Sequence, residues 1–522
     1  MRKRAWLQAE LPKEIATLEA EQAKGRAGTK AALDRARGIE GRQKRLAWLA
    51  TPRRLTYNPN GDNFGQASLS HAEVLKISAD FIRSKPSMRA MLATRFPFLL
   101  IDESQDTSKH LIDAFFALEE AEQGRFSLGL FGDTMQRIYA DGMEGLGDNL
   151  PPRWKRPVKR MNHRCPRRIV RLANAIRAGV DDQKQLARSD SSEGVVRLFI
   201  VAATATDKPS LESRARARMA ELTGDAGWLA DGNAVKTLTL EHHMAASRLG
   251  FLDMFEALNK DTRLTTGVRS GDLAGVRLFS ALVAPLVNAQ RAGNKFAVMA
   301  HLRQHSPLMR PQVLQAAADA GDPLADVRKA IDALTALQLD RQETRFLDVL
   351  RCVAAHGLFS IPDSLNSFIG DDSVEVVQDD EDDEDAAATG SLAAWRDFLE
   401  SSYRQIDAYA EYIADKGAFG THQGVKGLEF ERVLVVMDDS EARGFLFSYD
   451  KLFDAKPPTA ADQKKRAEGG ETGVDRTRRL LYVTCTRAER SLALIAYTGD
   501  SDKLESVAKA RGWFSADEIE RL

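Results

Sequence analysis

The chain has 522 residues, of which 43% are hydrophobic, and its 74 basic and 75 acidic side chains leave a net charge of −1. This length and apolar content predict about three domains with well-filled cores, and the balanced charge excludes a polycationic coat for nucleic acid. The three widely spaced cysteines fit neither a disulfide framework nor a zinc site, so we expect a reduced, cytoplasmic protein. No apolar run approaches the roughly 20 residues of a membrane span, so no membrane partner is expected.

Residues 1–50 are highly charged and rich in helix-forming residues, which predicts a helical hairpin. Residues 51–66 are rich in turn-forming residues, and a helical pattern then runs from Ser70 to about Ala93. We interpret residues 1–95 as a helical insertion and lead-in to the first lobe of an α/β fold.

Residues 99–103 read Leu-Leu-Ile-Asp-Glu, an apolar strand that ends in two adjacent carboxylates. Folds that hydrolyse nucleotides use an acidic pair in this place to hold Mg²⁺ and to orient a water molecule. Asp102 is therefore the predicted metal ligand and Glu103 the predicted general base. Residues 128–139 repeat the pattern, because a short apolar strand runs into the turn Gly132-Asp133 and is followed by Gln136 and Tyr139.

Residues 151–171 carry nine Lys or Arg side chains and no acid. This stretch is a candidate surface for tracking nucleic-acid phosphates, and a solvated basic face is the alternative. It contains Arg164 and leads into a helical pattern of apolar residues at Ile169, Leu172, Ala173 and Ile176.

The second half of the chain alternates strand-like and helical patterns. Residues 195–201 and 234–240 are predicted strands, and residues 245–415 are helical almost throughout. Residues 371–385 carry ten Asp or Glu side chains and are predicted to form a solvated loop; such a loop could also screen a DNA channel or hold a basic partner.

Two further motifs each precede an apolar strand. Residues 421–430 (Thr-His-Gln-Gly-Val-Lys-Gly-Leu-Glu-Phe) precede the predicted strand 432–437. Residues 478–488 (Arg-Arg-Leu-Leu-Tyr-Val-Thr-Cys-Thr-Arg-Ala) precede the predicted strand 491–496, with Cys485 expected as a small buried side chain.

These five motifs, in this order, resemble the UvrD/Rep-like branch of superfamily I DNA helicases. The resemblance is close over residues 95–180 and 415–500. It implies an α/β fold with two RecA-like parallel-sheet lobes, the first incomplete, and helical insertions. The implied division is 96–190 for the rest of the first lobe, 191–245 and 416–522 for the second lobe, and 246–415 for an inserted helical subdomain.

The resemblance also implies ATP and Mg²⁺ as cofactors and DNA as the partner, either single-stranded or with a single-stranded tail. Two lobes would close over the triphosphate, one with the metal and base and the other with stabilising cations. The roles implied for single residues are metal binding by Asp102, proton removal by Glu103, γ-phosphate sensing by Gln136, arginine fingers at Arg164 and Arg487, nucleotide binding by Gly427 and Glu429, base stacking by Tyr139, and contact with the DNA backbone by Thr421 and His422.

One part of the family pattern is missing. The phosphate-binding loop G-x-x-x-x-G-K-[ST] does not occur in the chain, and its nearest match, Gly25-Arg-Ala-Gly-Thr-Lys30, lies in a charged helical stretch. We therefore interpret the chain as an N-terminally incomplete DNA helicase or translocase, moving 3′→5′, with a repair protein or nuclease as a further partner. The alternatives are a non-catalytic nucleic-acid-binding or scaffold relative and a helicase subunit of a nuclease-linked defence complex.

Overall fold

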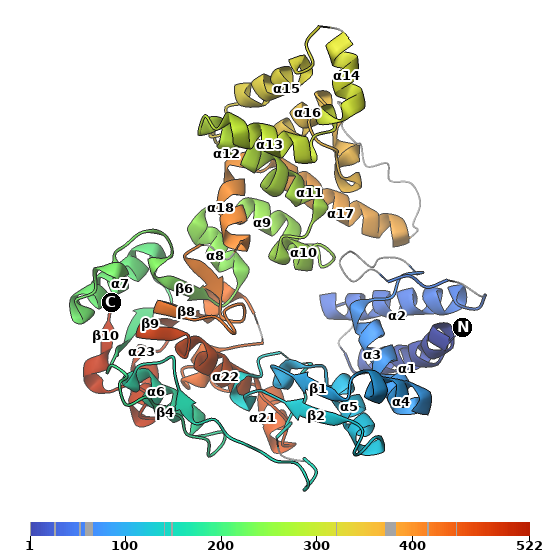
Figure 1. The fold of residues 1–522 in the computed structure, drawn as a ribbon. Coiled ribbons are helices and arrows are strands. Elements are labelled where there is room, and N and C mark those ends of the chain that lie inside the picture. The colour runs from blue at the N-terminus through green and yellow to red at the C-terminus, as the bar shows by residue number, and fades with distance from the viewer. Residues whose placement is uncertain are drawn as a thin grey trace. The chain divides into compact units, whose positions relative to one another are not determined.

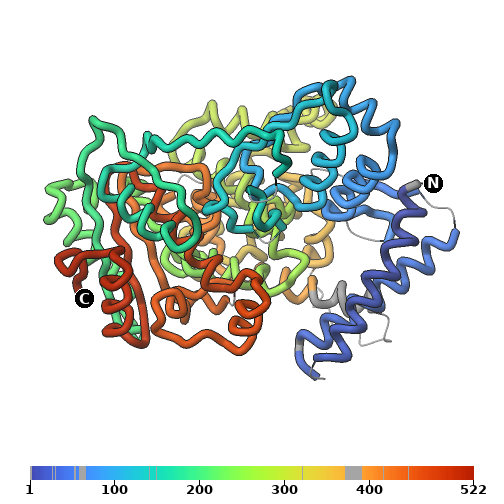
Figure 2. Tube along the Cα trace, turned by 90° about the horizontal axis from the view of Figure 1, so that it is seen from below, coloured from blue at the N-terminus to red at the C-terminus, as the bar shows by residue number. Residues whose placement is uncertain are grey.

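The computed structural model describes residues 2–25, 28–51, 54–57, 66–139, 141–147, 150–319, 321–370, 383–414, 417–444 and 446–522. These residues form two compact units, Met1–Arg156 and Pro157–Leu522. Figure 1 shows the chain as a ribbon and Figure 2 traces it from a second side.

The N-terminal unit begins with an antiparallel pair of helices, α1 (Arg2–Lys24) and α2 (Lys30–Trp48) (Figure 2). Ion pairs such as Arg42–Glu14 join them, and the Thr29 side chain caps α2. Leu7 and Leu11 pack with residues further along the chain in a small core. The predicted helical hairpin is confirmed.

The helical pattern predicted over 70–93 forms two helices, α3 (His71–Ser84) and α4 (Pro86–Arg95). Ser70 and Glu73 form a reciprocal cap at the start of α3. The break falls just before Pro86, because proline lacks the backbone N–H that a continuing helix requires.

A two-stranded parallel sheet completes the N-terminal unit. Strand β1 (Phe98–Ile101) pairs with β2 (Ser127–Leu130), and α5 (Lys109–Ala121) is the crossover helix between them. Leu99 and Leu128 pack on the buried Ala114 and Leu118 of α5. Short 3₁₀ turns follow both strands, η1 (Ser104–Asp106) and η2 (Thr134–Gln136).

The C-terminal unit contains a six-stranded parallel sheet in the order β10-β5-β9-β8-β6-β7. Its strands are β5 (Val195–Ala202), β6 (Lys236–Thr239), β7 (Phe419–Thr421), β8 (Phe430–Asp438), β9 (Ala488–Thr498) and β10 (Ile519–Arg521). The central strands β8 and β9 are buried over almost their whole length. The predicted α/β fold with parallel sheets is therefore confirmed, as are strands at 195–201, 432–437 and 491–496.

Helices flank this sheet. They are α6 (Arg167–Arg177), α7 (Lys208–Thr223), α8 (His242–Leu249), α19 (Asp439–Ala442), α20 (Tyr449–Leu452), α21 (Ala460–Ala467), α22 (Gly473–Cys485) and α23 (Ser501–Ala510). A separate two-stranded parallel sheet pairs β3 (Met161–Asn162) with β4 (Leu186–Ala187). Residues 157–190, assigned from the sequence to the first lobe, are part of this second unit. The reason is the buried apolar stripe of α6, which packs against β5 and α22.

The stretch between β6 and β7 is helical, as its sequence predicts. After α8 it contains α9 (Leu252–Asn259), α10 (Thr265–Ser270), α11 (Ala274–Arg277), α12 (Ala284–Arg291), α13 (Lys295–His305), α14 (Pro311–Asp319), α15 (Ala325–Ala336), α16 (Phe346–Ala355), α17 (Asp383–Glu400) and α18 (Ile406–Ile413). Phe279, Phe346 and Phe398 stack together in its core. Most of the acidic stretch, residues 371–382, lies outside the described residues, so its conformation stays a prediction.

One helical run within the described residues, Thr265–Arg291, is long and apolar enough to cross a membrane by length and composition alone. This corrects the sequence-based expectation that no such segment exists. Charged residues interrupt the run, and its apolar side chains Val276, Phe279 and Val283 are buried in the core of the helical stretch. The run contains α10, α11 and α12, with a break after Ser270, and it therefore packs as part of that core in this structure.

Candidate functional site

The two predicted acidic residues are exposed at the carboxyl end of β1. The backbone N–H of Glu103 donates to Oδ1 of Asp102 over 2.9 Å. Glu103 has a left-handed backbone (φ +49°), which side chains other than glycine adopt rarely. Such strain, about 1–3 kcal/mol, persists only where the surroundings impose it.

The surroundings of Glu103 are a buried turn. Gln105, only 2% exposed, donates from Nε2 to Oε2 of Glu103 over 2.6 Å, and the Ser104 N–H donates to the Phe131 carbonyl. A Cβ at Gly132 would collide with the Gln105 amide oxygen, so glycine is required there. Gln105 therefore holds the candidate base, and the hydrogen bond from Ser104 to Phe131 joins the two strand ends. The sequence analysis missed the role of Gln105 although the residue lies within the acidic motif.

Gln136 lies at the end of the neighbouring strand, in η2. The Asp133 side chain caps this turn by accepting from the Met135 N–H over 3.0 Å, and Gln136 Nε2 lies 3.5 Å from Asp133 Oδ2. Met135 is completely buried and anchors the turn. Because β1 and β2 are paired neighbours, the acidic pair and Gln136 stand at the same edge of one sheet.

Tyr139 is 46% exposed, and its backbone N–H lies 3.4 Å from Oδ1 of Asp106. Its ring is therefore accessible to a base, as a stacking role requires.

Residues from three distant motifs meet in the C-terminal unit. Arg164 Nε donates to Oε2 of Glu429 over 2.8 Å, and its Nη1 lies 3.4 Å from the Thr486 carbonyl oxygen. Asn162 fixes the backbone here, since its Oδ1 accepts from the N–H groups of Arg164 and Cys165. Arg164 is partly exposed, so it is a cation that a ligand can reach.

Arg487 is held differently from Arg164. It is only 2% exposed, and its guanidinium donates to the carbonyls of Val483 (2.9 Å) and Leu428 (3.1 Å) and to Oγ1 of Thr486 (3.1 Å). In this conformation the hydrogen bonds of Arg487 connect the 421–430 loop to the end of α22, and the buried guanidinium is not accessible to a nucleotide.

The loop formed by residues 421–430 is tightly closed. Thr421 Oγ1 accepts from the Gly424 N–H over 3.0 Å, and Gly427 takes a left-handed backbone (φ +82°) just before the exposed Glu429. The Phe430 N–H donates to the Arg487 carbonyl over 2.9 Å. Gly427, Glu429, Arg164 and Arg487 are thus parts of one local assembly.

The expectation for His422 needs correction. Its ring has no exposed surface, so it cannot touch a DNA strand in this structure. Nε2 lies 3.0 Å from the Leu238 carbonyl oxygen and Nδ1 lies 3.0 Å from the Tyr449 hydroxyl. Burial lowers the pKa of His422 to about 4, so the ring is neutral at physiological pH.

The thiols near the arginines are not reactive groups. Cys165 and Cys485 are both buried, as predicted for Cys485. Burial raises the pKa of Cys165 to about 11 and raises that of Cys485 further, which disfavours the nucleophilic thiolate.

The described residues contain no cluster of three or more His, Cys, Asp or Glu side chains able to hold a metal by themselves. Mg²⁺ does not need one, since it is commonly bound by one or two carboxylates together with phosphates and water. The exposed Asp102 fits that mode, whereas no loop of the sequence provides the phosphate cradle.

Only part of the basic stretch 151–171 is available to a polyanion. Arg153, Arg164, Arg168 and Arg171 are in ion pairs with carboxylates. Lys155, Lys159 and Arg160 are exposed and make no ion pair within the described part of the chain.

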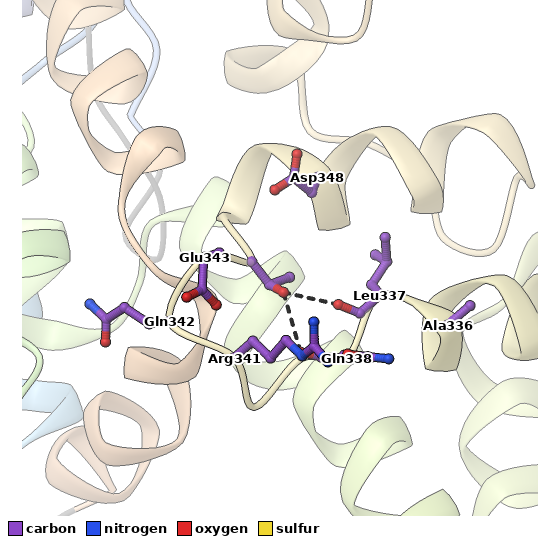
Figure 3. Close-up of a pocket in the computed structure, with 8 residues that line it drawn as sticks. Ala336, Leu337, Gln338, Arg341, Gln342, Glu343 and Asp348 are labelled. Carbon is purple, nitrogen blue, oxygen red and sulfur yellow. Dashed lines mark hydrogen bonds between the residues drawn. The ribbon is translucent and has the colours of Figure 1, made fainter.

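A surface hollow lies elsewhere, between α15 and α16 (Figure 3). Thr344 closes its loop by donating to the carbonyls of Leu337 and Gln338. None of the motif residues lines this hollow, so we do not assign it to the nucleotide site.

Comparison with known proteins agrees with the motifs. Residues 20–140 match the family model of the UvrD/REP helicase N-terminal domain. The chain is also similar to the Gabija protein GajB of Bacillus cereus (strain HuB5-5), with 22% identity over 480 residues; the match covers 86% of this chain and 65% of that protein. These findings confirm the resemblance to UvrD/Rep-like helicases.

Proposed function

We propose that the chain is part of an ATP-dependent DNA helicase or translocase of UvrD type that moves 3′→5′ in the cytoplasm. The observation that carries the proposal is the grouping of the motifs. Asp102, Glu103 and Gln136 stand at one sheet edge, and Arg164, Glu429 and Arg487 form one assembly in the other unit.

The carboxylates supply the acid–base and metal chemistry. Asp102 would hold Mg²⁺ on the phosphates, and Glu103 would accept the proton of the attacking water. The hydrogen bond from Gln105 orients the Glu103 carboxylate. When bound, Mg²⁺ would neutralise charge on the β- and γ-phosphates.

The arginines supply positive charge for the transferring phosphoryl group. Arg164 would have to leave the exposed carboxylate of Glu429 and one long contact, 3.4 Å, with the Thr486 carbonyl oxygen. Arg487 would have to leave two backbone carbonyls before it could act as a second cation. Arg164 is therefore the better-placed arginine finger.

The sequence pattern of a phosphate-binding loop does not occur in the 522 residues, and this determines how much ATP hydrolysis we expect from the chain. We expect DNA-stimulated ATP hydrolysis near background, because the lysine and backbone amides of such a loop are the main binding groups for the phosphates. Turnover of several per second would contradict this and would require an unrecognised phosphate site.

The test of the DNA part of the proposal is titration of a labelled single-stranded oligonucleotide at several salt concentrations. Affinity should fall steeply with salt, because phosphate contacts release counterions. The variant Lys159→Gln/Arg160→Gln should bind more weakly, with a salt slope smaller by about one per cation removed. Lys503→Gln, at another exposed lysine, is the matched control. A flat salt response, or no binding in dilute buffer, would refute the nucleic-acid function.

A non-catalytic nucleic-acid-binding or scaffold protein is the second candidate, favoured by the missing phosphate loop alone. It predicts DNA binding without any effect of Mg²⁺ and ATP on that binding. A defence-complex subunit with a nuclease partner is a weaker candidate, and it rests on the similarity to a Gabija protein.

A further inference from the structure

Helix α13, in the helical stretch between β6 and β7, has one side in the core and another side that is exposed. Val298 and Leu302 pack in the core. Phe296 is 85% exposed, the highest fraction for a large hydrophobic side chain in the described residues. A surface hollow of about 520 Å³ lies on this exposed side, and it is lined by Phe296, Met299, Ala300, Arg303 and Gln304. We call these five residues the α13 face.

The α13 face is a second stripe along a helix that already has a buried one. Its members recur at intervals of three or four positions, the spacing that places side chains on one side of a helix. An amphipathic helix of a globular protein normally presents one apolar stripe, toward the core, and polar residues elsewhere. Aromatic residues, Met and Arg are the types enriched where proteins contact partners. The composition of the α13 face is therefore that of an interface.

The sequence on both sides of the α13 face contains no acidic residue. Residues 273–318 carry five Lys or Arg and neither Asp nor Glu, in a chain whose basic and acidic residues are nearly equal in number. Lys295, Arg303 and Arg310 are exposed and make no ion pair within the part of the chain that the structure describes. An uncompensated positive surface attracts acidic partners and repels basic ones.

A polypeptide fits the α13 face better than a nucleic acid does. Grooves for single strands present several aromatic side chains on which successive bases stack, whereas Phe296 is the one aromatic residue of this face. A second copy of the chain fits poorly, because a two-fold symmetric contact places the same patch on both sides and would bring equal positive charges together.

We propose that the α13 face is the docking surface for an acidic, amphipathic segment of a partner protein. An apolar side chain of this segment would fill the hollow and cover Phe296 and Met299. Its carboxylates would pair with Lys295 and Arg303. Met299 suits such a contact because the unbranched methionine side chain adapts to different partners. Docking requires neither ATP nor DNA, so it can be tested separately from the proposed function.

The test uses a labelled synthetic peptide of repeated Glu-Leu-Leu-Glu units, titrated with the full chain and followed by fluorescence anisotropy. We expect saturable binding that weakens with salt, and slower hydrogen exchange of residues 295–305 when the peptide is present. Phe296→Glu should weaken binding by about tenfold or more, because the contact loses a buried aromatic side chain and gains a charge of the peptide's own sign. Lys295→Gln/Arg303→Gln should weaken binding and reduce its salt dependence.

Leu229→Glu is the matched control, because Leu229 is an exposed apolar residue of the same unit (59%) that lies outside the helical stretch. This variant should bind the peptide as the parent chain does. Circular dichroism of Phe296→Glu should match that of the parent chain, since the Phe296 side chain is already exposed.

Four results would overturn the proposal. The first is no binding, or equal binding of a peptide in which lysine replaces glutamate. The second is an equal loss of affinity in Phe296→Glu and Leu229→Glu. The third is a single-stranded oligonucleotide that displaces the peptide from the parent chain and no longer binds Phe296→Glu, which would make nucleic acid the occupant. The fourth is much tighter peptide binding once Asn and Gln replace the acids of residues 371–385, which would make this acidic stretch the occupant.

Discussion

Replacing Arg487 distinguishes its two candidate roles. An arginine finger that contacts only a nucleotide can be removed without loss of stability. The structure places Arg487 in a buried position where it bridges Val483 and Leu428, so we expect Arg487→Ala to destabilise the C-terminal unit.

The size of the effect follows from the hydrogen bonds. In Arg487→Ala the Leu428 carbonyl loses the Arg487 donor, whereas the Val483 carbonyl still accepts from Oγ1 of Thr486. A polar group left unsatisfied in this way costs about 1–3 kcal/mol, which is the expected loss of stability. Arg164→Ala is the matched comparison: it removes a partly exposed ion pair with Glu429, which contributes at most about 1 kcal/mol.

The measurement is urea unfolding of both variants beside the parent chain, followed by circular dichroism, together with hydrogen exchange of residues 421–430. Arg487→Ala should unfold at lower urea and should speed exchange in that loop, whereas Arg164→Ala should do neither. Equal midpoints for the two variants would refute the structural role of Arg487.

Three further predictions concern other residues. In a form that carries the phosphate loop, Glu103→Gln should abolish ATP turnover and spare nucleotide binding, because Asp102 still holds the metal; normal turnover would exclude Glu103 as the base. Gln105→Leu in that form should lower kcat and shift the pH profile of kcat, with a smaller effect on KM, because the hydrogen bond to Glu103 is lost. An unchanged pH profile would show that Gln105 contributes only to packing. His422 should lower the free energy of unfolding by up to about 1.4 kcal/mol per pH unit as the pH drops from 6.5 towards 4. The reason is that the ring binds a proton in the unfolded chain but stays neutral when it is buried in the folded one. In urea unfolding at pH 7, 6 and 5, His422→Phe should reduce this pH dependence.

The positions of these strands were well predicted, because local sequence patterns indicate them. The apolar runs before Asp102, within 432–437 and within 491–496 are long enough to indicate strands, and a parallel sheet buries such strands on both faces. The position of Pro86 likewise determined the break between α3 and α4.

The sequence by itself indicated which residues are candidates for the chemistry, because the adjacent Asp102 and Glu103, Gln136, and the arginines at 164 and 487 stand at motif positions. Only the tertiary structure decided how each side chain is held. Arg164 is partly exposed and forms an ion pair with Glu429, whereas Arg487 is buried and donates to backbone carbonyls. The buried His422 ring lies within hydrogen-bond distance of the Tyr449 hydroxyl. Burial of this kind comes from contacts between residues tens to hundreds of positions apart, which a local pattern does not encode.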